Sequence, residues 1–268
     1  MTKSGGRIAN LMLHYAVPLS GLRRVPFFGH ILGWMSRRLV PSDTLIWVQI
    51  QHGPAQGLWI RVNPRTGSNT EQGTDEPAVQ AAVQKHLRSG MTFYDLGANI
   101  GFFSLLASRI VGPTGHVASF EADPEIAARL TENLAFNKFA HASVEQKAVW
   151  SELGTVTFSR VNASISPDRG LGHVSVAEKG ATHTISVAAV SLDQYIQSHS
   201  APDFVKCDVE GAEVAVFDGA ERLLREKRPI LLVEMHSPEN QSSLTERFNR
   251  LSYVCTNLDA NHVLALPR

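Results

Sequence analysis

The sequence predicts an α/β protein with an open, mostly parallel sheet, and three observations support this fold class. Apolar runs at residues 93–96, 116–120 and 204–207 alternate with segments of helical periodicity, which is the pattern of βαβ units. The first run opens into a short turn with two glycines, and several runs end in an acidic residue. Because the carboxyl ends of parallel strands share one edge of the sheet, where ligands bind, that edge is the expected functional site.

Length and composition set the broad class. A chain of 268 residues can form one large domain or a domain with an appendage. Its 25 basic residues balance 25 acidic ones, so no overall field attracts nucleic acid, and no nucleic-acid partner is expected. Cys207 and Cys255 lie in apolar runs and fit buried, reduced thiols. With no apolar run near the roughly 18 residues of a membrane span and no clear signal peptide, a cytoplasmic location is expected.

Residues 1–62 are predicted to form an N-terminal add-on to a main domain at 63–268. Residues 1–40 carry six basic side chains and no acidic one, interleaved with apolar residues. This basic amphipathic segment fits a helical cap on the main domain, or a peripheral contact with a membrane surface or an anionic substrate. Two strands at 44–50 and 57–62 should follow as a hairpin.

The main domain is predicted to alternate strands and helices, with one interruption. It should begin with a flexible loop at 63–76, which could act as a mobile lid, and a helix from Pro77 to about Gly90. Strands are expected at 93–96, 115–121 and 142–146. Between them lie a helix that begins near Ile100 and stops at Gly112-Pro113, and a helix that is capped by Asp123 and ends near Asn137. Residues 154–190 then alternate polar and apolar residues at 155–159, 173–176 and 184–187, which predicts a β insertion that shapes the acceptor pocket. Ser191 should cap a short helix after it.

The turn Gly97-Ala98-Asn99-Ile100-Gly101 is the expected cofactor site. Glycines at 97 and 101 allow positive φ and close approach of a ligand, and a helix beginning near Ile100 would aim unpaired N–H groups at it. The spacing differs from the G-x-G-x-x-G of dinucleotide sites, so a diphosphate fits less well. Asp95, just before the turn, would repel phosphate but could accept hydrogen bonds from an ammonium group. A nucleoside with an amino-acid end, S-adenosylmethionine, meets these conditions.

A second acid supports the nucleoside. Glu121 ends the next predicted strand, twenty residues after Gly101, where a carboxylate can accept hydrogen bonds from both ribose hydroxyls. The adenine would lie near Ala148-Val149-Trp150, although Trp150 fits a core aromatic equally well. The predicted cofactor-binding residues are Asp95, Gly97, Ala98, Asn99, Gly101, Glu121, Ala122, Ala148 and Asp208.

Two further strand ends carry polar residues. Asp208, Glu210 and Glu213 follow the apolar run at 204–207, and this many carboxylates is costly unless they face a cleft, a cation or solvent. Glu234 and His236, two apart and hence on one face of an extended strand, end the run at 230–233. All of these side chains should meet at the sheet edge that holds Asp95 and Glu121.

The motifs at 93–101, 120–124, 191–193, 205–213 and 231–236 together resemble the FkbM family of class I S-adenosylmethionine-dependent methyltransferases, over roughly residues 75–236. The Asp-Leu-Gly-Ala-Asn-Ile-Gly turn is shared with other class I methyltransferases, while Lys-Cys-Asp-Val-Glu-Gly-Ala-Glu resembles the more family-specific K-x-D-x-E-G-x-E segment. The resemblance implies a Rossmann-like, seven-stranded sheet ending in an antiparallel hairpin, here at 251–257 and 262–266. It also implies methyl transfer to a hydroxyl of a sugar, glycolipid or polyketide-type acceptor.

In-line methyl transfer needs a group that removes the hydroxyl proton. His236 is the first candidate base, because an unperturbed imidazole has a pKa of about 6.5, and Glu234 could orient it. Asp208 with Glu210 is the alternative base pair. A divalent cation held by Asp208, Glu234 and His236 is the less favoured route to an acidified hydroxyl.

Other classes remain open from the residues alone. A nicotinamide-dependent Rossmann oxidoreductase would share the βαβ unit and the ribose acid but has a different glycine spacing. A non-catalytic binding protein could use the same fold, and an amino-group acceptor is not excluded. Methylation of a nucleic-acid base is disfavoured by the balanced charge and by the absence of an Asn-Pro-Pro-Tyr-like segment.

Overall fold

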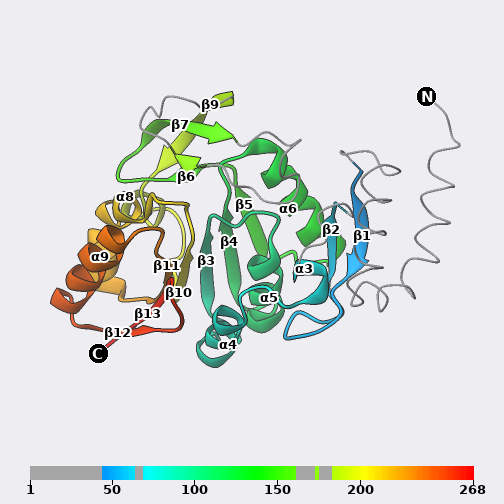
Figure 1. Cartoon of the computed structure of the whole chain (residues 1–268), viewed down its shortest axis with the longest axis horizontal. Coiled ribbons are helices and arrows are strands. Elements are labelled where there is room, and N and C mark those ends of the chain that lie inside the picture. Colours follow the sequence, from blue (N-terminus) through cyan, green and yellow to red (C-terminus); the bar gives the residue numbers. More distant parts are fainter. Residues whose placement is uncertain (1–43, 64–68, 161–172, 175–182) are drawn as a thin grey trace, which may run out of the picture.

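The computed structural model describes residues 44–63, 69–160, 173–174 and 183–268 (Figure 1). The basic segment 1–40 and most of 161–182 lie outside these residues, so the predictions about the N-terminal arm and its membrane contact stay predictions. Among the described residues, no helix is both long enough and apolar enough to cross a membrane.

A seven-stranded sheet forms the centre of the molecule. Its strands are β3 (Thr92–Leu96), β4 (His116–Phe120), β5 (Ala142–Glu145), β10 (Phe204–Cys207), β11 (Ile230–Glu234), β12 (Tyr253–Asn257) and β13 (His262–Pro267). The order across the sheet is β12-β13-β11-β10-β3-β4-β5. Neighbours from β11 to β5 pair in parallel, while β13 pairs antiparallel with both β11 and β12. The predicted mostly parallel sheet with a C-terminal antiparallel hairpin is confirmed.

The central strands are apolar on both sides because helices cover both faces of the sheet. Along β3, Phe93 belongs to one core cluster, and Tyr94 and Leu96 belong to the cluster on the opposite face. The covering helices are α4 (Pro77–His86), α5 (Phe102–Val111), α6 (Pro124–Phe136), α7 (Leu192–Tyr195), α8 (Glu213–Asp218), the π-helix η2 (Leu223–Lys227) and α9 (Pro238–Arg250). Asp123 caps α6 as predicted, accepting a hydrogen bond from the amide of Glu125 at 2.8 Å.

The predicted N-terminal hairpin is present as β1 (Ile46–Gln49) and β2 (Trp59–Val62), which pair antiparallel. It lies beside α6 (Figure 1). The amides of Trp59 and Arg61 donate hydrogen bonds to the side-chain oxygens of Asn137 and Asn133, both at 2.9 Å. Ile60 is buried in the same core cluster as the sheet strands. The hairpin therefore shares a core with the sheet; the boundary at residue 62 remains a prediction.

The polar segment before α4 differs from the expected loop. It contains the four-residue helix α3 (Asn69–Gln72). The segment then reaches Glu76, whose backbone has a φ of 40°, and continues into α4 with Pro77 in the first turn. Asn, Thr, Glu and Gln have no apolar stripe to mark a helix, so periodicity could not predict this element.

The predicted β insertion is confirmed as a small second sheet. Its strands are β6 (Ala148–Val149), β7 (Gly154–Arg160), β8 (His173–Val174) and β9 (His183–Val190), in the order β6-β9-β7-β8. This sheet lies above the carboxyl ends of β3, β4 and β10 in Figure 1. It therefore forms a second wall over the edge where the ligand site was expected.

Candidate active site

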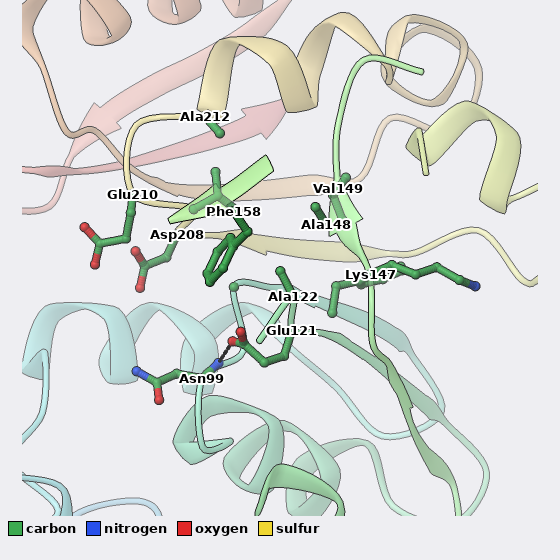
Figure 2. A pocket seen from close by; sticks show the side chains of 13 residues that line it. Asn99, Glu121, Ala122, Lys147, Ala148, Val149, Phe158, Asp208, Glu210 and Ala212 are labelled. Atoms are coloured by element: carbon green, nitrogen blue, oxygen red, sulfur yellow. Dashed lines mark hydrogen bonds between the residues drawn. The ribbon is translucent and has the colours of Figure 1, made fainter. Parts of the chain in front are cut away.

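A cavity lies at the carboxyl ends of β3, β4 and β10, beneath the insertion. Its empty space, counting the part open to solvent, is ≈ 580 Å³. Thirteen residues line it: Gly97, Asn99, Phe120, Glu121, Ala122, Lys147, Ala148, Val149, Phe158, Asp208, Val209, Glu210 and Ala212 (Figure 2). Of the nine predicted cofactor-binding residues, six lie on this lining: Gly97, Asn99, Glu121, Ala122, Ala148 and Asp208.

Both predicted glycines have positive φ, but they serve different contacts. Gly97 (φ 75°) lines the cavity, and a Cβ there would lie 1.7 Å from the carbonyl oxygen of Asp208. Gly101 (φ 94°) is outside the lining, and a Cβ there would lie 2.2 Å from Cδ1 of Leu130 on α6. Gly97 thus lets β3 and β10 approach at the cavity, while Gly101 lets α5 pack on α6.

The turn does not offer its amides to a ligand. The N–H groups of Gly97 and Ala98 both donate to the carbonyl of Phe120, and that of Gly101 donates to the carbonyl of Ala98. The amide of Asn99 donates to Glu121, and that of Ile100 donates to the Asn99 side chain. These five bonds occupy the amides of residues 97–101, so the turn itself leaves no free N–H group for the ligand.

Glu121 lies on the cavity lining, directly after β4. It is 8% exposed, and one carboxylate oxygen accepts from the amide of Asn99 at 2.9 Å while the other accepts from the amide of Asp123 at 2.8 Å. Two of its four acceptor sites are used in this way, which leaves capacity for two hydroxyl donors. Burial raises the pKa of Glu121 to about 7, even though both amide bonds favour the ionised form.

Asp95 is not at the cavity. It is fully buried below the turn, where Oδ2 accepts a hydrogen bond from the Ser104 hydroxyl at 2.6 Å and Oδ1 lies 4.0 Å from Nζ of Lys206. Burial raises the pKa of Asp95 despite the nearby ammonium group of Lys206. The side chain therefore points toward α5 and β10, away from the cavity lining, and its expected contact with a ligand ammonium group stays a prediction.

The apolar part of the lining fits a flat base. Ala122, Ala148 and Val149 lie along it, as expected, and Phe158 projects from β7 of the insertion (Figure 2). Phe158 was not predicted, because periodicity predicts strands but not which strand residue meets the cavity. Trp150 is partly buried against the core of the small sheet and is not on the lining, which favours the core-aromatic alternative.

Asp208 and Glu210 supply the acidic part of the lining. Oδ2 of Asp208 accepts a hydrogen bond from Nζ of Lys206 at 3.1 Å. Burial alone would raise the pKa of Asp208, but the Lys206 ammonium group outweighs it and holds that pKa below its ordinary range. Glu210 has a φ of 52° and a side chain that is 37% exposed. With Glu121 they give the cavity three carboxylates, whereas its one lysine, Lys147, is paired with Glu145 at 2.9 Å.

His236 lies against these carboxylates but outside the lining. Its Nε2 is 3.3 Å from Oε2 of Glu210 and 3.8 Å from Oδ1 of Asp208, and its Nδ1 is 2.7 Å from Oε1 of Glu213. Hydrogen bonds with Glu210 and Glu213 raise the pKa of His236 to about 10. This raised pKa differs from the unperturbed imidazole value on which the base assignment rested and favours the imidazolium at neutral pH; the identity of the base stays a prediction.

Glu213, not Glu234, orients His236. It is completely buried and also accepts hydrogen bonds from the amide of Gly211 at 2.8 Å and the side chain of Asn240 at 2.6 Å. Glu234 lies 4.0 Å from Nε2 of His236. The sequence marks Glu213 as the third carboxylate after β10. It does not show that Glu213 faces His236, because that direction is set by the start of α8.

The suggested metal triad stays a prediction: Nε2 of His236 lies 3.8 Å from Asp208 and 4.0 Å from Glu234, and two further groupings of ligand atoms lie nearby. Ligand atoms of Asp208, Glu210 and His236 lie within 4.8 Å of one another, and so do those of Glu76, Glu234 and His262. Glu234 belongs to the second grouping because its Oε2 faces the ring of His262, at 3.6 Å from Nε2.

These features fit S-adenosylmethionine better than a dinucleotide. Glu121 has free acceptor sites for ribose hydroxyls, and the wall with Phe158 is apolar enough to cover a base. An excess of carboxylates favours a ligand that carries a sulfonium and an ammonium group and disfavours a pyrophosphate. The sheet and its edge site therefore agree with a class I S-adenosylmethionine-dependent methyltransferase.

Comparison with known proteins agrees with this class. Residues 95–257 match the family model described as the methyltransferase FkbM domain. The match covers more than half of the chain, and the chain belongs to this family. It is therefore an S-adenosylmethionine-dependent methyltransferase with a Rossmann-like fold, and the oxidoreductase alternative falls away.

Two curated relatives are also methyltransferases. The chain is 24% identical over 255 residues to the hexuronic acid methyltransferase AglP of Haloferax volcanii, covering 93% of this chain and 91% of that protein. It is 30% identical over 108 residues to an arsenite methyltransferase of Halobacterium salinarum, covering 38% of this chain and 27% of that protein. Among solved structures, the methyltransferase FkbM from Methylobacillus flagellatus aligns at 17% identity and a TM-score of 0.48, over 73% of this chain and 56% of that one.

Proposed function

We propose that this protein transfers a methyl group from S-adenosylmethionine to an oxygen of a sugar, with uronic-acid sugars as the first acceptor class to test. The support is the similarity to a hexuronic acid methyltransferase along nearly the whole chain, including the segments that form the cavity. The acidic groups at the cavity and its partial opening to solvent are consistent with an acceptor whose hydroxyl must lose a proton.

The chain's residues have separate tasks in this proposal. Glu121 holds the ribose, and Phe158 with the alanines of the lining covers the base. When bound, S-adenosylmethionine supplies an electrophilic methyl group. The chain then has to place the acceptor oxygen opposite the sulfur and remove its proton.

The carboxylate pair Asp208–Glu210 is the proposed proton acceptor. Both side chains line the cavity, and Asp208 is ionised at neutral pH because its pKa is lowered. His236 is already protonated at that pH, so it has no free lone pair for a hydroxyl proton. We assign it as a positioning residue, whose imidazolium fixes Glu210 from one side while Glu213 fixes the ring from the other.

Methyl transfer from radiolabelled S-adenosylmethionine to glucuronic acid glycosides, neutral hexose glycosides and glycolipids tests the proposal. Label on a glycoside hydroxyl is expected, as an ether that survives mild alkali, whereas a methyl ester of the uronic carboxylate would release methanol. Asp208→Asn and Glu210→Gln should reduce turnover by roughly 10²–10⁴-fold if they carry the proton transfer. Glu246→Gln, with a side chain that is 73% exposed on α9, is the matched control. Labelling of proteins or small amines but no sugar would contradict the proposal.

A further inference from the structure

A second group of ligating side chains lies at the same edge of the sheet, outside the methyl-donor cavity. Glu76 comes from the residue before α4, Glu234 from the end of β11 and His262 from the start of β13. One carboxylate oxygen of each glutamate and Nε2 of His262 lie within 4.8 Å of one another. Three segments that are distant in the sequence thus bring one imidazole and two carboxylates together.

The atoms that face one another lack ordinary hydrogen bonds. Nε2 of His262 is 3.5 Å from Oε2 of Glu76 and 3.6 Å from Oε2 of Glu234. Within the described part of the chain, Nε2 of His262 and Oε2 of Glu76 are buried without a hydrogen-bond partner, and the His262 side chain is only 8% exposed. A buried imidazole nitrogen therefore points between two carboxylates at a spacing that is too long for a hydrogen bond.

The spacing is the one that a shared ion requires. Two ligand atoms that are each about 2.1 Å from a metal ion lie roughly 3.0–3.5 Å apart in octahedral or tetrahedral geometry. The observed separations of 3.5 and 3.6 Å are close to the upper value. Glu76 and Glu234 have side chains that are 33% and 21% exposed, so an ion can enter from solvent.

Asp259 gives the imidazole the orientation of a metal ligand. Its carboxylate lies 2.8 and 2.9 Å from Nδ1 of His262, and it accepts hydrogen bonds from the amides of Asn261 and His262. A carboxylate on one ring nitrogen holds the proton there, so an ion at Nε2 would displace only the second proton of a charged ring, which gives the usual arrangement around metal-bound histidines.

The local charge also favours a cation. Glu76, Glu234 and Asp259 surround one imidazole, so the group is negative even when His262 is protonated. Lys206, the nearby ammonium group that interacts with Glu76, is already bonded to Asp208 at 3.1 Å. A divalent ion would offset this excess of negative charge.

We propose that Glu76, Glu234 and His262 form a binding site for a divalent first-row transition cation of the Mn²⁺ or Zn²⁺ type, with Asp259 orienting His262. One imidazole and two carboxylates are a mixed donor set suited to these ions. The ion would join the segment before α4 to β11 and β13. Because the other oxygen of Glu234 lies 4.0 Å from His236, the site adjoins the proposed catalytic groups. The inference does not depend on the acceptor or on methyl transfer.

Titration of the metal-free protein with Mn²⁺ tests the site without an activity assay. Electron paramagnetic resonance measures binding as the loss of the free Mn²⁺ signal. We expect one ion per chain and a rise in the unfolding temperature with Mn²⁺. Glu76→Gln and His262→Gln should each weaken binding more than tenfold, and Asp259→Asn should weaken it by about 10–100-fold. Glu76→Gln is the safer variant for folding, since its side chain is partly exposed.

His236→Gln separates this site from the neighbouring grouping of Asp208, Glu210 and His236. It should bind Mn²⁺ as the unmodified protein does. The proposal is overturned if the unmodified protein binds no Mn²⁺ at millimolar concentration, if folded Glu76→Gln binds as tightly as the unmodified protein, or if His236→Gln loses as much affinity as Glu76→Gln.

Discussion

Lys206 donates a hydrogen bond to Asp208 at 3.1 Å from a position under the floor of the cavity, where its side chain is only 4% exposed. Its ammonium group also lies 4.0 Å from Asp95. Burial alone would lower the pKa of Lys206, but these two carboxylates outweigh burial and raise it. The lysine is therefore a fixed positive charge that joins the ends of β3 and β10.

Replacing Lys206 with methionine should strongly destabilise the fold. The change keeps most of the side-chain volume but leaves Asp95 and Asp208 without their buried cation, a loss that typically costs about 3–5 kcal/mol. Chemical denaturation at neutral pH measures the difference. Lys147→Met is the control, because its side chain is 39% exposed and its ion pair with Glu145 should contribute under about 1 kcal/mol. Equal stability of both variants would contradict the role of Lys206.

Gly97→Ala should impair folding more than the same change at Gly211. Both glycines have positive φ, at 75° and 98°, so each alanine carries a similar backbone strain of about 1 kcal/mol. Only the Cβ at Gly97 meets backbone, 1.7 Å from the carbonyl of Asp208, whereas nothing lies within 4 Å at Gly211. Thermal unfolding and titration with S-adenosylhomocysteine should both separate the variants. A Gly97→Ala protein as stable as Gly211→Ala would show that β10 can move away without cost.

The sequence predicted the sheet well because its signals are local. Apolar runs marked β3, β4, β10 and β11, and Asp123 and Ser191 marked helix starts by their capping chemistry, whereas β12 and β13 were expected only from the family resemblance. The helix α3 was not predicted, because its four polar residues have no apolar periodicity. The family motifs added the topology, which local patterns do not contain.

The sequence could predict which residues lie at the ends of the strands, but not which way their side chains point. Placing acids at one edge of the sheet correctly joined Glu121 to Asp208 and Glu210. It could not show that Asp95 turns inward to Ser104, or that Glu213 instead of Glu234 holds His236, because those choices depend on side-chain directions set by α5 and α8. Likewise, no sequence spacing predicts that Glu76 meets His262, since the contact joins opposite ends of the domain.

Cofactor affinity should rise with pH around neutrality through Glu121. Its pKa of about 7 means that the carboxyl is mostly protonated at pH 6, and ribose hydroxyls make stronger hydrogen bonds to the ionised form. Binding of S-adenosylhomocysteine should strengthen by up to about tenfold from pH 6 to 8. Glu121→Gln should weaken binding by about 10–100-fold and remove this pH dependence, because hydrogen bonds to a charged acceptor contribute about 1.5–3 kcal/mol. Calorimetry at several pH values measures both effects, and an unchanged slope in the variant would assign the titration to another group.

The pH dependence of turnover should decide between the two candidate bases. If Asp208 with Glu210 accepts the proton, kcat should be level between about pH 7 and 9, because the lowered pKa of Asp208 keeps it ionised throughout. If His236 were the base, its pKa of about 10 would make only a small fraction neutral at pH 7, and kcat would rise about tenfold per pH unit toward pH 10.

A variant of His236 adds a second, independent comparison. As a positioning residue, His236 changed to glutamine should lower kcat by roughly tenfold, leave the level pH profile in place and keep affinity for S-adenosylhomocysteine, since the ring is outside the cavity lining. A loss of roughly 10²–10⁴-fold together with disappearance of a rising alkaline limb would instead return the base role to His236. His199→Gln serves as the matched control because its ring stacks on Tyr195, with centroids 3.9 Å apart, and makes no contact with the carboxylates of the β10 turn among the described interactions.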